Sequence, residues 1–421
     1  MNEGSQASRG PGGELRIAYL IPEFPGQTHA FFWRERRRLE RLGVRVDLFT
    51  TRQPPPSVRA RHDWAEAAEA STAHLVPLGW IGAIESVTEI LRAGPRGWGR
   101  VARCLWQSEA PGLKGRARLA AALLLGARLS ARSRRQGVAH VHVHSCADAA
   151  NVALLANRLS GLGYSLTLHN PLDCYGPNQP QKWKHARFAI VITRKILAEV
   201  EEELEGMLPP RVFVAPMGVD EEAFCRVESY EPCRGGDRFR IFSCSRINPG
   251  KAIDDLVRAM ARLEELGVDA ELRVAGADDV GGSYRDELLA LAAELGVSDR
   301  VHLLGSLSEH EVLAELRAAH AFGLASHAEP LGIAIAEAMA VELPVVATAA
   351  GGVPELVTDG VDGLLVPPRA PEAFAEALAR IARDPELAER LSARSRKTIL
   401  ESFHSGVSAS AIHEGIRRPA H

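Results

Sequence analysis

The chain has 421 residues, of which 46% are hydrophobic and 24% are charged, and its formal net charge is −3 at pH 7. This is the composition of an ordinary globular protein, and the length exceeds what one hydrophobic core supports, so we expect two domains. No run of about 18 apolar residues occurs, which excludes a transmembrane helix.

Residues 1–14 lack the apolar core of a signal peptide and are predicted to form a disordered leader. The six cysteines show neither a CxxC spacing nor the density of a disulfide scaffold, which favours reduced thiols in a cytoplasm. Residues 1–210 contain 28 Lys and Arg against 19 Asp and Glu, whereas the remainder contains 22 against 34. A basic first half could face a membrane surface, nucleic acid or an anionic ligand, or simply carry solvated helix faces.

Strand and helix patterns alternate over residues 15–220, as expected for a doubly wound α/β domain. "LRIAYLI" (15–21) is a short apolar run typical of a strand buried on both faces. Helical patterns span 80–136, although "AGPRGWG" (93–99) must break them. The other expected elements are helices at 28–42 and 150–159 and strands at 44–50, 140–144, 164–169, 188–193 and 211–216.

The alternation restarts after "YEPCRGGDR" (230–238), the best linker candidate, and gives a second domain over residues 221–400. We expect strands at 239–244, 270–276, 300–305, 320–326, 344–348 and 363–367, and helices at 250–266, 283–296, 309–319, 332–341 and 371–399. The predicted fold class is α/β, with two Rossmann-like doubly wound domains facing across a cleft. Ligands of such sheets bind outside the carboxyl ends of the strands, so the chemistry is expected in the loops there.

One loop of the second domain is suited to a diphosphate. "SRINPGK" places Arg246 and Lys251 between a strand and a helix N-terminus. Arg can bind two phosphate oxygens at once, Lys is a compact point charge, and the helix N-terminus adds partial positive charge. Taken alone, the same residues also fit a solvated basic loop.

A second loop carries two carboxylates eight residues apart. In "SHAEPLGIAIAEAMA", Glu329 precedes a turn and Glu337 lies about one and a half turns inside the following helix. Gly332 permits close approach of a ligand, and the amides of Leu331, Gly332 and Ile333 would point at an anion. Glu329 could accept hydrogen bonds from sugar hydroxyls and Glu337 from a ribose diol. The alternative is a capping carboxylate followed by a solvent-facing one.

These motifs carry a family resemblance. "EPLGIAIAEAMA" resembles the E-x7-E signature of retaining GT-B glycosyltransferases, specifically glycosyltransferase family 4, and "PVVATAAGGVPELVTDGVDGLLVPP" resembles the segment that follows it. "SRINPGK" matches the Arg-x4-Lys of the family, and "HVHVH" and "LTLHNPLDCYGPNQ" resemble exopolysaccharide-type members. The resemblance covers nearly the whole chain and is most specific in its second half. It implies sugar transfer from a nucleotide diphosphate-sugar, such as a UDP- or GDP-sugar, with retention and without a metal or other cofactor.

The resemblance also implies domain and residue roles. Residues 15–220 would be the acceptor domain, residues 221–400 the donor domain, and residues 401–421 a helix that returns to the N-terminal domain. Arg246 and Lys251 would hold the donor diphosphate, with the amides of residues 331–333. Glu329 would contact the transferring sugar and Glu337 the ribose. His169 would face the donor sugar and the acceptor, and the loop with Gly26 would cover the donor phosphates. Asp173 and His144 would lie on the acceptor side.

Three other functions stay open at this point. The absence of GxGxxG after "LRIAYLI" argues against a nicotinamide-dependent oxidoreductase. "RERRRLER" (34–41) could bind nucleic acid, but a solvated helix face opposite Phe31, Phe32, Leu39 and Leu42 is favoured, so we predict no nucleic-acid partner. The third open function is that of a GT-B relative that forms no glycosidic bond, such as an epimerase.

The acceptor is predicted to be a saccharide, a lipid-linked molecule or a small molecule. Polysaccharide or glycoconjugate assembly is the leading interpretation, and glycosylation of a small natural product is the alternative. The arginines of residues 34–41 and 92–135, with Trp98 and Trp106, could rest on anionic lipid. The predicted location is therefore cytoplasmic, at the inner face of a membrane if this lipid contact forms.

Overall fold

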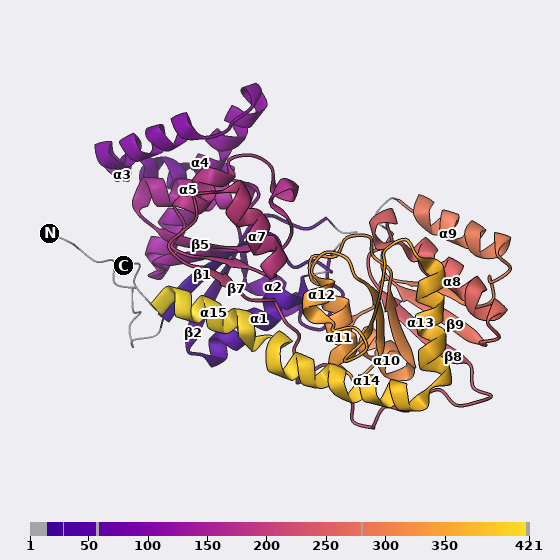
Figure 1. The fold of residues 1–421 in the computed structure, drawn as a ribbon. Coiled ribbons are helices and arrows are strands. Elements are labelled where there is room, and N and C mark those ends of the chain that lie inside the picture. Colours follow the sequence, from indigo (N-terminus) through magenta and orange to yellow (C-terminus); the bar gives the residue numbers. More distant parts are fainter. Residues whose placement is uncertain (1–14, 28, 56–58, 279–280, 418–421) are drawn as a thin grey trace. The chain divides into compact units, whose positions relative to one another are not determined.

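The computed structural model describes residues 15–27, 29–55, 59–278 and 281–417, so the predicted leader, residues 1–14, lies outside the described residues. The chain divides into two compact units: unit 1 comprises Met1–Pro216 and Gly406–His421, and unit 2 comprises Met217–Ser405. Each unit contains one parallel sheet with helices around it (Figure 1). The prediction of an α/β fold with two Rossmann-like units is confirmed.

The sheet of unit 1 has the strand order β3-β2-β1-β4-β5-β6-β7 with parallel pairing throughout. The central strand β1 contains five consecutive residues, from Ile17 to Ile21, that are fully buried. A continuous apolar run of this kind is expected where helices cover both faces of a sheet. The strands are β1 (Leu15–Glu23), β2 (Val44–Arg52), β3 (Thr72–His74), β4 (His140–Val143), β5 (Gly163–Leu168), β6 (Ala189–Val191) and β7 (Val212–Val214).

Helix α3 of unit 1 is kinked at Gly94, immediately before Pro95, which confirms the predicted break in residues 93–99. Several short elements, including β3, have no counterpart in the sequence predictions because they are too short to show periodicity. The helices of unit 1 are α1 (Ala30–Arg41), α2 (Ala65–Ser71), α3 (Gly79–Gln107), α4 (Gly112–Gln136), α5 (Asp148–Ser160), η2 (Leu172–Tyr175), α6 (Gln179–Lys184), α7 (Arg194–Glu203) and α15 (Gly406–Arg417).

The last helix, α15, is part of unit 1 although it is far from the other elements in sequence. It contacts α1 and β6. Two arginines of unit 1 cap its final turn: Arg187 Nη2 donates to the carbonyl of Ile416 at 3.0 Å, and Arg211 Nη2 donates to that of Gly415 at 3.2 Å. Cations suit this end because the terminal carbonyls are unpaired and the helix dipole is negative there.

The sheet of unit 2 has the order β10-β9-β8-β11-β12-β13, again with parallel pairing. Residues 230–238 belong to this unit rather than to a linker, since Tyr230 is buried and its hydroxyl donates to the carbonyl of His320 at 2.8 Å. The strands are β8 (Phe239–Cys244), β9 (Ala270–Ala275), β10 (Val301–Gly305), β11 (Ala321–Leu324), β12 (Val345–Thr348) and β13 (Leu364–Val366).

The helical pattern over 371–399 is two helices rather than one. The Asp384 carboxylate accepts a hydrogen bond from the amide of Leu387 at 2.9 Å, and Pro385 occupies the first turn, so a new helix begins there. The helices of unit 2 are η3 (Pro249–Lys251), α8 (Ile253–Glu265), α9 (Ser283–Glu294), α10 (Glu309–Ala318), α11 (Ile333–Ala340), α12 (Val353–Leu356), α13 (Pro371–Arg383), α14 (Pro385–Thr398) and η4 (Ile399–Phe403).

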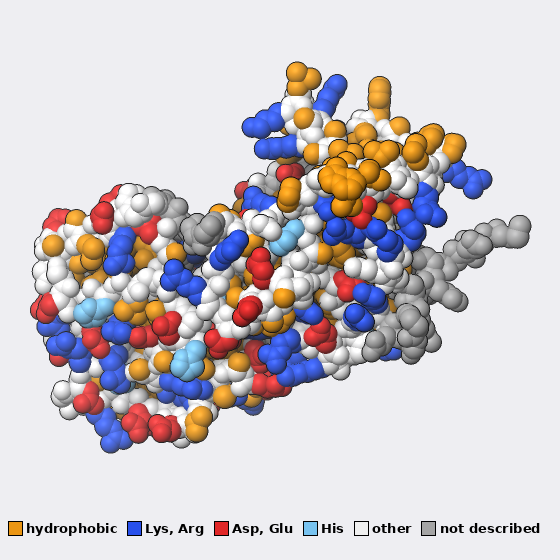
Figure 2. All heavy atoms as spheres, turned by 180° about the vertical axis from the view of Figure 1, so that it is seen from behind, with side chains coloured by type: hydrophobic (Ala, Val, Ile, Leu, Met, Phe, Trp, Pro, Cys, Tyr) orange, Lys and Arg blue, Asp and Glu red, His pale blue; other side chains and the backbone are white. Residues whose placement is uncertain are grey.

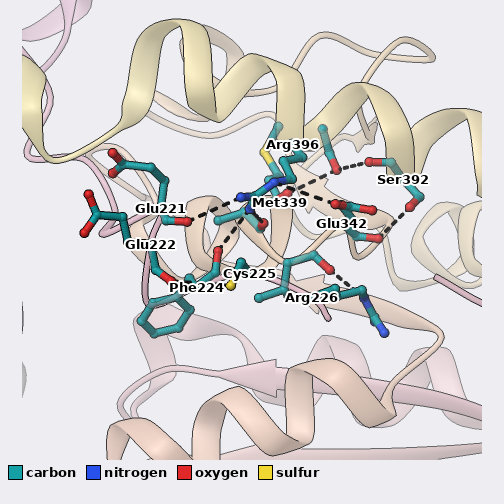
Figure 3. Close-up of polar contacts among 12 residues, drawn as sticks. Glu221, Glu222, Phe224, Cys225, Arg226, Met339, Glu342, Ser392 and Arg396 are labelled. Atoms are coloured by element: carbon teal, nitrogen blue, oxygen red, sulfur yellow. Dashed lines mark hydrogen bonds and ion pairs between the residues drawn. The ribbon is translucent and has the colours of Figure 1, made fainter. Parts of the chain in front are cut away.

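Side chains of α14 and of the segment 221–226 hold the carboxyl end of α11 (Figure 3). Arg396 Nη1 donates to the carbonyls of Phe224, at 3.1 Å, and of Ala340. Arg226 Nε donates to the carbonyl of Val341 at 2.6 Å, and Ser392 Oγ donates to that of Glu342 at 2.7 Å. These bonds satisfy the terminal carbonyls of α11, and they fix a helix that starts after Gly332 and carries Glu337.

We expect Arg396→Met to destabilise unit 2 by about 2–4 kcal/mol, because a hydrogen bond to a charged group is worth about 1.5–3 kcal/mol and its loss leaves carbonyls unpaired. Urea unfolding followed by circular dichroism measures the change. Arg390→Met, on an exposed position of the same helix, is the matched control and should leave the midpoint unchanged. Equal midpoints for the two variants would contradict the capping role.

Candidate functional site

In unit 2 the predicted residues gather where the strand order reverses. Strands β8 and β11 are neighbours, but the chain leaves them toward opposite edges of the sheet, and sheets of this kind bind ligands outside the carboxyl ends of such strands. Arg246 and Lys251 follow β8, and Glu329 follows β11. Lys251 Nζ lies 2.5 Å from Glu329 Oε2, with side chains that are only 18% and 11% exposed. Residues 78 positions apart in sequence thus form a partly buried ion pair.

The loop that carries Glu329 is fixed from several sides. Ser326 Oγ donates to Glu329 Oε2 at 3.3 Å, and the amide of Gly352 donates to the carbonyl of Glu329 at 2.9 Å. The amide of His327 donates to the carbonyl of Gly250 at 3.1 Å, next to Lys251. The loops after β8, β11 and β12 are therefore joined by hydrogen bonds, and the carboxylate is held in place before any ligand binds.

Helix α11 begins directly after this loop. Gly332 is its N-cap residue, with φ of 97°, and no side chain caps the helix start. A Cβ atom at Gly332 would lie 2.8 Å from Ile335 Cδ1, and the left-handed φ adds strain for any other residue. The positive end of the helix dipole and the amides of the first turn therefore face the same edge as Lys251. The roles of the amides of Leu331, Gly332 and Ile333 remain predictions.

Glu337 lies on α11 toward the end of β8. Desolvation raises the pKa of the Cys244 thiol to about 12, and the nearby Glu337 carboxylate adds to the shift. Cys244 ends β8, two residues before Arg246. The charge of Glu337 therefore acts at the carboxyl end of the same strand that leads to Arg246.

Gly351 allows the loop after β12 to approach Glu329. Its φ is 60°, and a Cβ there would lie 2.0 Å from the carbonyl oxygen of Glu329. We expect Gly351→Ala to destabilise unit 2 by more than Gly360→Ala, which has φ of 71° but no atom within 4 Å of the added Cβ. The control variant, Gly360→Ala, loses only about 1–2 kcal/mol, the cost of a left-handed backbone conformation for a residue with a Cβ atom. Equilibrium unfolding of both variants checks this, and equal losses would show that the close approach is unimportant.

In unit 1 the predicted residues also lie at the carboxyl ends of central strands. Gly26 follows β1 and His144 follows β4, at the point where this sheet reverses its order. A Cβ at Gly26 would lie 2.6 Å from His29 Nδ1, so the loop is tightly folded. Asp173 lies on η2 with an exposed side chain. The donor role of Gly26 and the acceptor role of Asp173 remain predictions.

His169 follows β5 and packs against aromatic rings. Its ring centroid lies 5.5 Å from that of Phe31, 5.7 Å from that of Phe32 and 5.7 Å from that of His144. Its Nε2 is buried without a hydrogen-bond partner. Burial, with a smaller contribution from His144, lowers the pKa of His169 to about 3, so the ring is neutral near pH 7. A neutral imidazole can donate or accept one hydrogen bond at each nitrogen, but it carries no charge to stabilise a phosphate.

One residue of this region, Glu35 of α1, was not predicted from the sequence. Its side chain is fully buried; Tyr19 OH donates to Glu35 Oε2 at 2.6 Å, and His144 Nε2 lies 3.1 Å from the same oxygen. Burial raises the pKa of Glu35, and hydrogen bonds from Ser408 and Tyr19 oppose the shift. His144, an acceptor-side candidate, is thus buried against Glu35.

The interpretation of residues 34–41 as a solvated face was wrong in part. Arg34 and Glu35 are buried, whereas Leu42, expected on the buried face, is 43% exposed. The spacing of Phe32, Glu35 and Leu39 puts all three on one helix face, and this signal could have identified Glu35. The solvated face was predicted from the charges of residues 34–41 alone.

The described residues contain no group of three or more His, Cys, Asp or Glu side chains placed to hold a metal ion. Within the same residues no helix is long and apolar enough to cross a membrane.

Comparisons with known proteins give consistent similarities. The sequence profile of the family described as Glycosyl transferases group 1 matches residues 233–398. The D-inositol 3-phosphate glycosyltransferase of Frankia alni is 30% identical over 389 residues, which cover 85% of this chain and 86% of that protein. The enzyme of the same name from Stackebrandtia nassauensis is 30% identical over 394 residues, covering 87% of this chain and 81% of that protein.

Solved structures match along nearly the whole chain. A glycosyltransferase from Rickettsia africae ESF-5 has a TM-score of 0.69 at 15% identity and covers 96% of this chain and 98% of its own. Anabaena HepE in complex with UDP-glucose has a TM-score of 0.68 at 17% identity and covers 95% and 98%. At these identities the likeness shows a shared fold.

Proposed function

Because this chain belongs to the group 1 glycosyltransferases and has the GT-B fold, we propose that it is a family 4 member that transfers a sugar from a nucleoside diphosphate donor to an acceptor hydroxyl with retention at the anomeric carbon. The observation that carries this proposal is the contact between Lys251 and Glu329 at the carboxyl ends of β8 and β11. It supports the proposal because a cation able to bind phosphate lies beside a carboxylate able to bind sugar hydroxyls, and a nucleotide-sugar donor carries both groups.

The donor roles follow the chemistry of each group. Arg246 and Lys251 bind the diphosphate, aided by the first amides of α11. Glu329 accepts hydrogen bonds from the transferring sugar, and Glu337, near the end of β8, accepts them from the ribose. Uridine diphosphate is the favoured carrier, since HepE, which shares this fold, was solved with UDP-glucose. A guanosine diphosphate carrier is the alternative.

In the proposed reaction the bond between the anomeric carbon and the diphosphate oxygen breaks, and the acceptor oxygen bonds to the same carbon from the same side. The departing phosphate takes the proton of the acceptor hydroxyl. Catalysis consists mainly of stabilising the negative charge that grows on the diphosphate, which is the role proposed for Lys251 and Arg246. The neutral ring of His169 is proposed to orient the sugar or acceptor by hydrogen bonding.

The acceptor class is the finer part of the proposal. Polysaccharide or glycoconjugate assembly is the preferred role, with a saccharide or lipid-linked acceptor. Two outcomes would replace this role. One is transfer to a small natural product, and the other is a reaction that forms no glycosidic bond.

The deciding experiment has two stages. Thermal shifts with UDP, GDP and their sugars identify the carrier, because a ligand that binds only the folded protein raises the unfolding midpoint. Incubation with the chosen donor and a panel of acceptors, followed by NMR of the anomeric proton, then reports the linkage. A product with inverted configuration, or donor turnover without a new glycosidic bond, would contradict the proposal.

Metal independence is a separate prediction. We expect full turnover after dialysis against EDTA, because Lys251, Arg246 and the α11 N-terminus supply the positive charge that a divalent ion would otherwise provide. Initial rates with EDTA and with added Mg²⁺ or Mn²⁺ measure this. Activity that disappears with EDTA and returns with a metal would show that the charge compensation assigned to these groups is insufficient.

A further inference from the structure

The first half of α3, residues 79–93, has its polarity reversed relative to an ordinary surface helix. Helices on globular proteins bury an apolar stripe and expose charged residues. Here the buried positions are Gly82, Ser86 and Glu89, none of them a large hydrophobic residue. The apolar side chains of this segment must therefore lie on its outer face.

The inner face is held by ion pairs with α4. Glu89 Oε2 lies 2.6 Å from Arg134 Nη2. Glu85 contacts Arg128 at 3.3 Å, Arg132 at 3.5 Å, and Arg135 as well. These pairs fix the rotation of α3 about its axis, so the exposure of its apolar face is not a consequence of loose packing.

The outer face of this segment is apolar. Trp80 is 74% exposed, Ile84 58% and Leu91 64%, and their spacing of four and seven residues places them on one side of the helix. Helices α3 and α4 pack together as a helical hairpin, and farther along this hairpin Trp106 is 91% exposed and Leu113 87%. Figure 2 shows hydrophobic side chains gathered over the region that α3 and α4 occupy. Exposed apolar patches of this kind mark interaction surfaces.

Basic residues accompany this apolar face. The cations of residues 79–118 are all exposed: Arg92, Arg96, Arg100, Arg103, Lys114, Arg116 and Arg118. Among them Arg100 binds the carbonyl of Arg158 at 2.9 Å. Of the three acidic residues in this range, Glu85 and Glu89 face α4, which leaves Glu109 as the exposed one. The surface is therefore apolar and positively charged at once.

We propose that this hairpin face, defined by the apolar outer face of α3, Trp106, Leu113 and the basic residues beside them, binds an anionic lipid surface. Apolar side chains and tryptophan rings would enter the boundary between headgroups and acyl chains, and the long basic side chains would reach lipid phosphates. Each basic residue near such a surface contributes about fivefold in binding.

The charge pattern favours lipid over a second copy of the chain. A symmetric dimer places the same patch on both subunits, so this face would bring its own cations together. Like charges at such a contact oppose association, whereas the anionic headgroups of a membrane neutralise them. This inference does not depend on the proposed sugar transfer.

Vesicle co-sedimentation tests the proposal without any measurement of activity. The full chain should bind phosphatidylcholine vesicles enriched in phosphatidylglycerol and bind pure phosphatidylcholine weakly, and added salt should reduce binding. Tryptophan emission should shift to the blue on binding, since Trp80 and Trp106 become buried. No binding to the anionic vesicles, or equal binding to both kinds, would overturn the proposal.

Two variants locate the surface. Trp80→Ser/Ile84→Ser/Leu91→Ser should weaken vesicle binding on the order of a hundredfold or more, because each large side chain contributes at least about tenfold when buried. Arg92→Glu/Arg96→Glu/Arg103→Glu should abolish the preference for anionic vesicles. The control Val227→Ser/Leu289→Ser removes exposed apolar side chains of unit 2 and should bind as wild type does.

Circular dichroism confirms that each variant is folded. A triple-serine variant that is folded and binds vesicles as well as wild type would overturn the proposal. So would sedimentation analysis in which wild type is a dimer and this variant a monomer, because the face would then be covered by a second copy.

Discussion

Replacing Lys251 by alanine is expected to lower the turnover of sugar transfer by about 10²-fold or more, because removing one prepositioned group that stabilises developing charge costs about 10²–10³ in rate. Lys251 contacts Glu329 at 2.5 Å in a partly buried position, so its ammonium is held in place before any ligand binds, and the proposed function assigns it to the diphosphate. Steady-state kinetics with saturating donor measures the effect.

The effect should be larger on kcat than on KM. A group that acts on charge present only in the transition state lowers kcat and kcat/KM together, whereas one that binds ground state and transition state equally raises KM alone. Lys397→Ala is the control: this side chain is 57% exposed and lies 3.7 Å from Glu401 on the same helical stretch. Near-wild-type turnover of the Lys251 variant would reject the diphosphate assignment.

The ion pair also has a consequence for Glu329. Removing Lys251 leaves this carboxylate partly buried without its cation, so some of the measured loss could come from a displaced loop rather than a missing charge. Lys251→Met/Glu329→Gln removes both charges and keeps the side-chain lengths. Glu329→Gln alone measures the loss of the carboxylate. If the double variant regains the stability of wild type but is still much slower than Glu329→Gln, the missing cation accounts for the remaining loss of turnover.

The sequence predicts most of the strands well because they are continuous apolar runs, such as Ile17–Ile21, and such runs have few alternatives in an α/β chain. It does not predict short elements, for example the three-residue strand β3, because they make few local contacts and form only through pairing with β2. Composition predicts a linker at residues 230–238, but the buried Tyr230, bonded to the carbonyl of His320, belongs to unit 2.

The site residues of unit 2 were identified from spacing and a family resemblance, and the contact between Lys251 and Glu329 brings two of them together. The environment of Glu35 depends on Ser408, more than 370 residues away, and no local pattern reports such a contact. The same holds for α3, whose reversed polarity becomes visible only when its inward carboxylates are paired with the arginines of α4.

Unit 1 is expected to unfold cooperatively as the pH falls from 6.5 toward about 3. Burial lowers the pKa of His140, His144 and His169 to about 3 in each case, from an ordinary value near 6.5 in the unfolded chain. The stability contributed by these neutral rings is fully present above pH 6.5 and is lost as the unfolded chain takes up protons. Each histidine contributes a slope of about 1.4 kcal/mol per pH unit.

Three such histidines give about 4 kcal/mol per pH unit, against a typical total stability of about 5–15 kcal/mol, so unfolding should be complete within a few pH units. Glu35 opposes this, because burial raises its pKa and the folded state gains a proton there at a higher pH than the unfolded chain does. All six tryptophans lie in unit 1, so tryptophan emission against pH reports this unit alone.

Replacing His140 by glutamine should reduce the slope of the free energy of unfolding against pH, below pH 6.5, by about 1.4 kcal/mol per pH unit. The reason is that one proton fewer is taken up on unfolding. His140 Nε2 lies 2.8 Å from Ser165 Oγ, so glutamine can keep a hydrogen bond there although it loses the stacking on Phe188. The lost stacking lowers stability at every pH, whereas the slope reports only the titration. An unaltered slope in the His140 variant would mean that this ring is already protonated in the folded chain, or is not buried as the fold requires.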